Sequence, residues 1–169
     1  KMCESYNRQY GTDFISVIPT NLYGPNQNYD PLNSLVVPAL IRKFHEAKLA
    51  NAKEVVIWGT GRPARDFLFA DDLADASIFL MNMYSGDDVF NIASGRDYTI
   101  SELAQIVKKT IGFDGNIVFD VSKPEGVLVK MQDISKISSL GWKYSTDLEV
   151  GIQQAYLAIP TSGFPSKMG

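Results

Sequence analysis

A run of β-branched and aromatic residues from Phe14 to Ile18 ends abruptly at Pro19. Such a run is typical of a strand buried on both faces, and Pro19 ends the hydrogen-bond ladder because it has no backbone donor. Asn21 and Tyr23 follow directly. In open α/β sheets, ligands bind beyond the carboxyl ends of the strands. The segment therefore predicts a ligand-binding edge, with an ordinary strand-to-loop exit as the alternative.

The composition limits the classes of protein to which this chain can belong. Its 169 residues are 45% hydrophobic and 21% charged, as in ordinary globular proteins, and a net charge of −3 gives no reason to expect nucleic acid. No apolar run approaches membrane-spanning length. Cys3 and His45 are the only cysteine and histidine, which excludes an internal disulfide and argues against a zinc site. We expect a cytoplasmic protein with no metal, membrane or nucleic-acid partner.

Hydrophobic periodicity predicts alternating strands and helices, which indicates the α/β class. Helices are expected at 1–10, 34–48, 71–80, 99–111, 135–140 and 147–159, and strands at 14–18, 54–58, 67–69, 89–93 and 116–119. Thr99 and Glu102 have the spacing of a capping box. Asp71 or Asp72, and also Asp147, are expected to cap their helices.

Basic residues gather around one aromatic residue. Arg62 and Arg65 follow Trp58, and Arg42 and Lys43 lie on the preceding predicted helix. Guanidinium groups bind phosphate oxygens in a fork, lysine adds a point charge, and a tryptophan can stack against a ring. The pattern predicts a phosphate site, with solvent-exposed surface charge as the alternative.

Two motifs of a complete dinucleotide-dependent reductase do not occur in this sequence. It contains no G-x-G-x-x-G phosphate loop, and no tyrosine is followed four positions later by a lysine. The chain is therefore predicted to be the second half of an enzyme. The helix at 1–10 would then continue from the first half.

Several motifs, in order, resemble the GDP-L-fucose synthase family of extended short-chain dehydrogenase/reductases. They are KMCESYNRQYG at 1–11, PTNLYGP at 19–25, PALIRKFHEA at 38–47, WGTG at 58–61, RDFL at 65–68, DDLA at 71–74, TISELA at 99–104, KPEG at 123–126 and LGW at 140–142. The resemblance covers about residues 1–157. It implies an α/β fold made of the last strands and helix of a Rossmann sheet plus the smaller substrate-binding domain.

The resemblance also implies domain limits. Residues 1–33 would be the C-terminal remnant of the NADP-binding Rossmann domain. Residues 34–159 would form the GDP-sugar-binding domain, with some segments returning to the Rossmann sheet. Residues 160–169, rich in Pro, Gly and Ser, are expected to be a disordered tail.

The family converts GDP-4-keto-6-deoxy-D-mannose to GDP-L-fucose by two epimerisations and an NADPH-dependent reduction of the ketone. By resemblance, the cofactor NADP(H) would lie against Pro19, Thr20, Asn21 and Leu22. The GDP-sugar would be held by Lys43, Trp58, Arg65 and Lys130. The helix at 1–10 would take part in a homodimer.

The chain departs from the family at the position of its catalytic acid. The family has Asn-Ser-His where this sequence has Asn33, Ser34 and Leu35, and leucine cannot transfer a proton. The other catalytic residues of the family would lie before Lys1, so no catalytic residue is assigned to this chain. Three functions remain open: a GDP-L-fucose synthase, an enzyme that only reduces a GDP-4-keto sugar, and a non-catalytic fragment that binds nucleotide sugars or partner chains.

Overall fold

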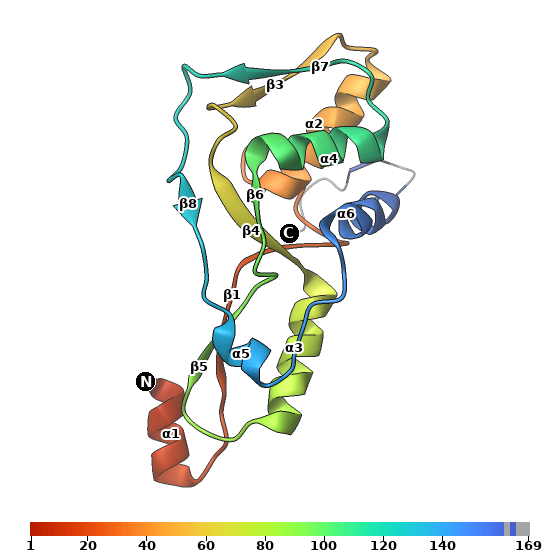
Figure 1. Ribbon diagram of the computed structural model, residues 1–169. Helices are drawn as coiled ribbons and strands as arrows, with labels where there is room; N and C mark the ends of the chain where they lie inside the picture. Colours follow the sequence, from red (N-terminus) through yellow and green to blue (C-terminus); the bar gives the residue numbers. More distant parts are fainter. Residues whose placement is uncertain (161–162, 165–169) are drawn as a thin grey trace.

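The computed structural model describes residues 1–160 and 163–164 and shows an α/β protein (Figure 1). Its helices are α1 (Met2–Tyr10), α2 (Val36–Leu49), α3 (Ala70–Met83), α4 (Ile100–Ile111), α5 (Ser135–Ser139) and α6 (Leu148–Leu157). Its strands are β1 (Ser16–Pro19), β2 (Asn21–Tyr23), β3 (Glu54–Trp58), β4 (Ala64–Phe69), β5 (Val89–Ile92), β6 (Asp97–Thr99), β7 (Asn116–Asp120) and β8 (Val129–Lys130). The predicted fold class is confirmed.

The strands form three small groups. β1 pairs in parallel with β5, and β3 pairs in parallel with β7. β4 lies beside β2 and β8, both parallel to it, and beside the antiparallel β6. β4 therefore runs between the two ends of the molecule and connects them (Figure 1).

The prediction for the first strand is right about its end and wrong about its burial. β1 ends at Pro19, and the next residue, Thr20, donates its backbone N–H to the carbonyl of Ile92 at 3.0 Å. Ile18, however, is 50% exposed, because β1 pairs only with β5 among the described strands. The chain then continues directly into β2, a strand that was not among those predicted.

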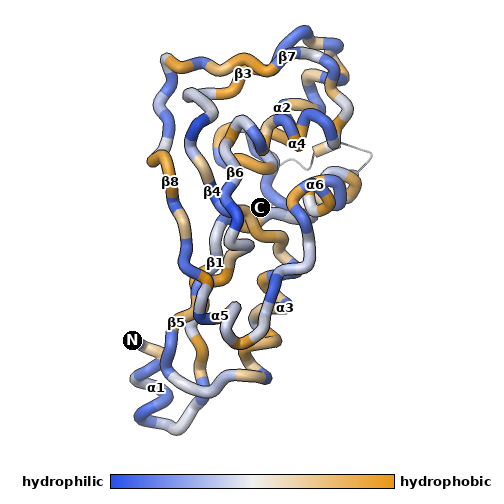
Figure 2. The backbone as a smooth tube through the Cα atoms, viewed as in Figure 1, coloured by the Kyte–Doolittle hydropathy of each residue, from blue (hydrophilic) through white to orange (hydrophobic). Residues whose placement is uncertain are grey.

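Two hydrophobic cores lie at opposite ends of the chain's long axis (Figures 1 and 2). One is built from α2, α4, α6 and the strands beside them, around residues such as Phe44 and Val107. The other is built from α3, β5, α5 and the end of β4, around Leu80 and Phe90. Residues 89–92 form β5, which belongs to the second core and pairs with β1 near the N-terminus. The domain limits at residues 33 and 159 stay a prediction.

Helix ends agree only in part with the predicted caps. Thr99 and Glu102 form the full capping box, with Glu102 N–H donating to Thr99 Oγ1 at 3.1 Å. The N-cap of α3 is Phe69, so the predicted capping by Asp71 or Asp72 is wrong; Asp147 is the N-cap residue of α6 as predicted, but its side chain makes no capping hydrogen bond. Asp72 is instead buried, and its carboxylate accepts hydrogen bonds from the segment just before α6.

The predicted disordered tail falls mainly on residues 161–162 and 165–169, which lie outside the described residues. Phe164 is described, and its ring lies 5.1 Å from that of Tyr29 and 5.2 Å from that of His45. None of the helices in the described part of the chain is both long and apolar enough to cross a membrane.

Candidate functional site

A cavity of about 580 Å³ opens between the start of α2, strand β3 and the loop that follows β7. The residues around it come from four separate stretches of the chain: Pro31, Leu32, Ser34, Val36, Ala39, Leu40, Arg42, Lys43 and Glu46; Ile57, Trp58, Gly61, Pro63 and Arg65; Ile100; and Pro124, Glu125 and Gly126.

Three of the four residues predicted to hold a GDP-sugar line this cavity together. Lys43 lies on α2, Trp58 ends β3, and Arg65 lies on β4. Lys43 Nζ donates to the Val56 carbonyl of β3 at 2.8 Å, and Arg65 Nη1 donates to the carbonyl of its neighbour Ala64 at 2.6 Å. Trp58 is 63% exposed, so its ring is available to a ligand.

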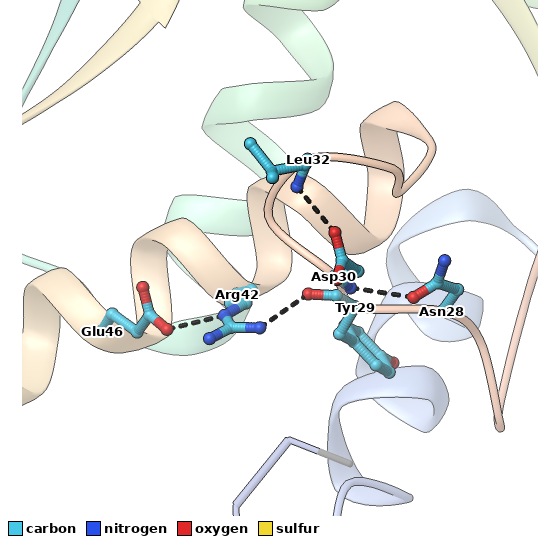
Figure 3. Close-up of polar contacts among 6 residues, drawn as sticks. All are labelled: Asn28, Tyr29, Asp30, Leu32, Arg42 and Glu46. Atoms are coloured by element: carbon cyan, nitrogen blue, oxygen red, sulfur yellow. Dashed lines mark hydrogen bonds and ion pairs between the residues drawn. The ribbon is translucent and has the colours of Figure 1, made fainter. Parts of the chain in front are cut away.

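Arg42 also lines the cavity, but its charge is used inside the fold (Figure 3). Its guanidinium contacts the Glu46 carboxylate at 2.6 Å, one helical turn further along α2, and donates to the Tyr29 carbonyl at 2.9 Å. Arg42 thus fastens the loop before α2 to the helix. Among the residues that the structure describes, Lys43 and Arg65 are the cations of the lining that form no ion pair with a carboxylate.

The loop between β7 and β8 closes one side of the cavity through Glu125. Its carboxylate accepts hydrogen bonds from the backbone N–H and the hydroxyl of Thr60, at 2.8 and 2.7 Å. These bonds lower the pKa of Glu125. Gly59 permits the contact, because its φ is +82° and a Cβ there would lie 2.9 Å from Glu125 Cβ. Lys123 Nζ lies 5.8 Å from the centroid of the Trp58 ring.

The residues predicted to face the nicotinamide line a second, smaller pocket of about 90 Å³. Pro19, Thr20 and Asn21 form one side, and Lys130 and Gln132 form the other. Leu22 is not in its lining and packs into the core around Leu80 and Phe90. Lys130, predicted beside the other GDP-sugar residues, is thus in the smaller pocket. It is paired in register with Arg65 across β4 and β8, which places the two pockets next to each other.

Asp66 fixes the position of this rim. Its backbone carbonyl accepts from Thr20 Oγ1 at 3.1 Å and from Asn21 Nδ2 at 2.9 Å. Its carboxylate accepts from the N–H and hydroxyl of Ser94 and from the N–H of Gly95, at 2.7 to 3.0 Å. Asp66 is only 2% exposed, and burial raises its pKa against the effect of these bonds. Its partners lie far away in sequence, so no local pattern marked it as an anchor.

Leu35, which stands at the place of the family's acid, is the residue before α2 and is 62% exposed. It does not line either pocket, although its neighbours Ser34 and Val36 line the larger one. Within residues 1–160 and 163–164, no three His, Cys, Asp or Glu side chains gather in a way that could hold a metal ion.

Parallel strand pairs, intervening helices and a polar edge beyond β1 define an α/β protein of the Rossmann type. Residues 1–93 match the model of the NAD dependent epimerase/dehydratase family, and the chain belongs to that family. It is similar to the probable GDP-L-fucose synthase 1 of Oryza sativa subsp. japonica, with 56% identity over 156 residues that cover 92% of this chain and 48% of the relative.

Two solved structures are also similar. One is a GDP-6-OMe-4-keto-L-xylo-heptose reductase from Campylobacter jejuni, with a TM-score of 0.83, 39% identity and coverage of 92% of this chain and 56% of that one. The other is a GDP-mannoheptose C4 reductase from the same organism with NADP bound, with a TM-score of 0.78, 39% identity and coverage of 92% and 55%. The chain spans about half the length of the curated relatives it matches.

Proposed function

We propose that this chain supplies the nucleotide-sugar-binding part of an NADP(H)-dependent enzyme that converts GDP-4-keto-6-deoxy-D-mannose to GDP-L-fucose. The observation that carries the proposal is the meeting of Lys43, Trp58 and Arg65, from three different elements, around one cavity of about 580 Å³. A volume of this size is in the range of ligand pockets. The similarity to a GDP-L-fucose synthase over 92% of the chain supports the choice of substrate.

The charges around the cavity suit a diphosphate. Arg65 offers a guanidinium fork for phosphate oxygens, and Lys43 adds a second positive charge. The two carboxylates in the lining are already engaged, Glu46 by Arg42 and Glu125 by Thr60. Arg42 offsets the negative charge of Glu46, whereas Glu125 keeps its charge and is held on Thr60 at one side of the cavity. The exposed ring of Trp58 offers a flat apolar surface to the sugar or the base.

NADP(H) is proposed as the cofactor, with its nicotinamide end at Pro19, Thr20 and Asn21. These three residues suit contact with one edge of the nicotinamide ring. Pro19 presents no N–H, the Thr20 and Asn21 side chains are fixed on the Asp66 carbonyl, and the adjoining pocket measures about 90 Å³. When bound, the cofactor would supply hydride to the ketone. The similar Campylobacter reductase with NADP bound supports this choice.

A reductase without epimerase activity is the second candidate. Leu35 favours it, because this side chain cannot protonate a carbon next to the ketone. The two Campylobacter reductases, both similar over 92% of this chain, also favour it.

Product analysis separates the two candidates. The complete protein would be incubated with GDP-4-keto-6-deoxy-D-mannose and NADPH, and the sugar product identified by NMR. We expect GDP-L-fucose. A reduced sugar that keeps the manno configuration would replace the first proposal with the second. No NADPH oxidation, together with retained GDP binding, would leave the chain as part of a non-catalytic binding protein.

A homodimer formed through α1 is also proposed. Met2, Tyr6 and Tyr10 lie on this helix with 75%, 46% and 63% of their surfaces exposed, and the helix buries none of its residues in the described chain. Sedimentation of the complete protein should give a dimer. A monomer at micromolar concentration would rule this out.

A further inference from the structure

One residue that lines the smaller pocket, Gln132, carries a buried hydrogen-bond acceptor that no other described residue uses. Gln132 lies between β8 and α5, and its Oε1 is buried without a hydrogen-bond partner within the described part of the chain. Its Nε2 reaches the Pro19 carbonyl at 3.5 Å. A buried carbonyl oxygen with no donor costs free energy, so native proteins rarely retain one without a reason. A ligand that donates a hydrogen bond would remove this cost.

The orientation of the Gln132 amide follows from its neighbour. The Pro19 carbonyl can only accept a hydrogen bond, and the amide nitrogen is the only donor in the Gln132 side chain. Rotating the amide by half a turn would place two carbonyl oxygens against each other. The oxygen is therefore the amide atom that is left without a hydrogen-bond partner among the described residues.

The other polar groups of the pocket limit what can bind there. Asn21 uses its Nδ2, and Thr20 its hydroxyl proton, on the Asp66 carbonyl. Lys130 Nζ takes part in no hydrogen bond or ion pair within residues 1–160 and 163–164, and lines the same pocket. The residues that line the pocket thus carry amide carbonyl acceptors and one ammonium donor. A hydroxyl group satisfies both, since it donates to the carbonyl and accepts from the ammonium.

The location of the pocket identifies the source of the hydroxyl. Lys130 is in register with Arg65, which faces the larger cavity, and the opposite wall is the Pro19 to Asn21 rim. A group in the pocket would therefore lie between the proposed diphosphate site and the proposed nicotinamide site. In a nucleoside diphosphate sugar, that group is the sugar. About 90 Å³ accommodates a hydroxyl-bearing edge of a sugar ring but not a purine base.

We propose that Gln132 is a specificity-determining residue that accepts a hydrogen bond from a sugar hydroxyl of the bound nucleoside diphosphate sugar. This inference rests on the proposed function. Gln132 was not among the residues predicted to hold the GDP-sugar, and its Oε1 is the atom that would accept the hydrogen bond.

Isothermal titration of the complete protein with GDP and with GDP-mannose tests the proposal. Gln132→Met keeps the length of the side chain and removes both amide atoms, whereas Gln132→Glu keeps an acceptor oxygen. Gln105→Leu, at an exposed glutamine of α4, is the control. We expect Gln132→Met to weaken GDP-mannose binding about 3- to 10-fold, as for the loss of one hydrogen bond. GDP binding should stay within about twofold, and Gln132→Glu should bind GDP-mannose more tightly than Gln132→Met.

The outcomes separate this inference from the proposed function. If the unmodified protein binds neither ligand, the proposed function fails. If it binds both, and Gln132→Met weakens them equally or not at all, the function stands and the inference about Gln132 is overturned. The same variants would be titrated with NADPH. Weaker NADPH binding with unchanged GDP-mannose binding would assign the acceptor to the cofactor and also overturn the inference.

Discussion

Replacing Asp66 with alanine should destabilise the protein strongly, although this residue lies in neither pocket lining. The carboxylate accepts three hydrogen bonds from Ser94 and Gly95. The Ser94 hydroxyl can turn to the Arg96 carbonyl, which is already 3.3 Å away, so the main loss comes from the two backbone N–H groups. Each bond to a charged acceptor contributes about 1.5–3 kcal/mol, which gives about 3–6 kcal/mol for the pair.

Two effects reduce this sum. Burial raises the pKa of Asp66, which means that the folded protein bears a cost for the buried charge that alanine removes. Gly95 is exposed, so water can take the place of one acceptor. We therefore expect a loss of about 2–4 kcal/mol in the free energy of unfolding at pH 7.

Urea unfolding at equilibrium measures the loss. Asp114→Ala, at an exposed aspartate in the turn before β7, is the control and should change the unfolding free energy by less than about 0.5 kcal/mol. A loss below about 1 kcal/mol for Asp66→Ala would refute the view that Asp66 anchors the turn at residues 94–95.

Three further predictions concern separate parts of the structure. Tyr23→Phe should raise the free energy of unfolding by about 1 kcal/mol, because the Tyr23 hydroxyl is buried without a partner among the described residues; a thermal melt checks this, and a lower melting temperature would contradict it. The backbone N–H and the hydroxyl of Thr60 both lower the pKa of Glu125, and Thr60→Val removes only the hydroxyl, so the pKa should rise part of the way toward its ordinary value. In the unmodified protein the contact stabilises the fold above about pH 4.3 and is lost as the pH falls through the folded pKa; an NMR titration of the Glu125 carboxyl that is unchanged in the variant would exclude a contribution from the hydroxyl. If the complete protein only reduces its substrate, Leu35→His should restore epimerised product, and unchanged product would show that more than the acid is missing.

Local sequence patterns predicted the parts of this fold that depend on neighbouring residues. The capping box at Thr99, the strand from Glu54 to Trp58 and the end of β1 at Pro19 all follow from side chains within a few positions. The exposure of Ile18 could not be predicted in this way, because burial of a strand depends on which other strands lie beside it.

The carboxylates show the same limit. Asp72 matches a helix cap by position, yet it binds Ser145 and Thr146, more than seventy residues away. Asp66 likewise binds partners 28 and 29 residues further on. Both act through contacts created by the fold. The charge pattern grouped Lys43, Trp58 and Arg65 with Arg42 and Arg62, and the resemblance to a family selected the first three. The structure adds that these three surround one cavity.

Titration of GDP into the complete protein and two arginine variants tests the central claim most directly. Arg65 lines the cavity, whereas Arg62 is an exposed neighbour outside the lining and provides a matched control. Arg65→Ala should weaken GDP binding by about 1.5–3 kcal/mol, roughly 10- to 150-fold, and Arg62→Ala should change it less than about threefold. Equal affinities for the unmodified protein and Arg65→Ala would contradict the assignment of this cavity to a nucleoside diphosphate sugar.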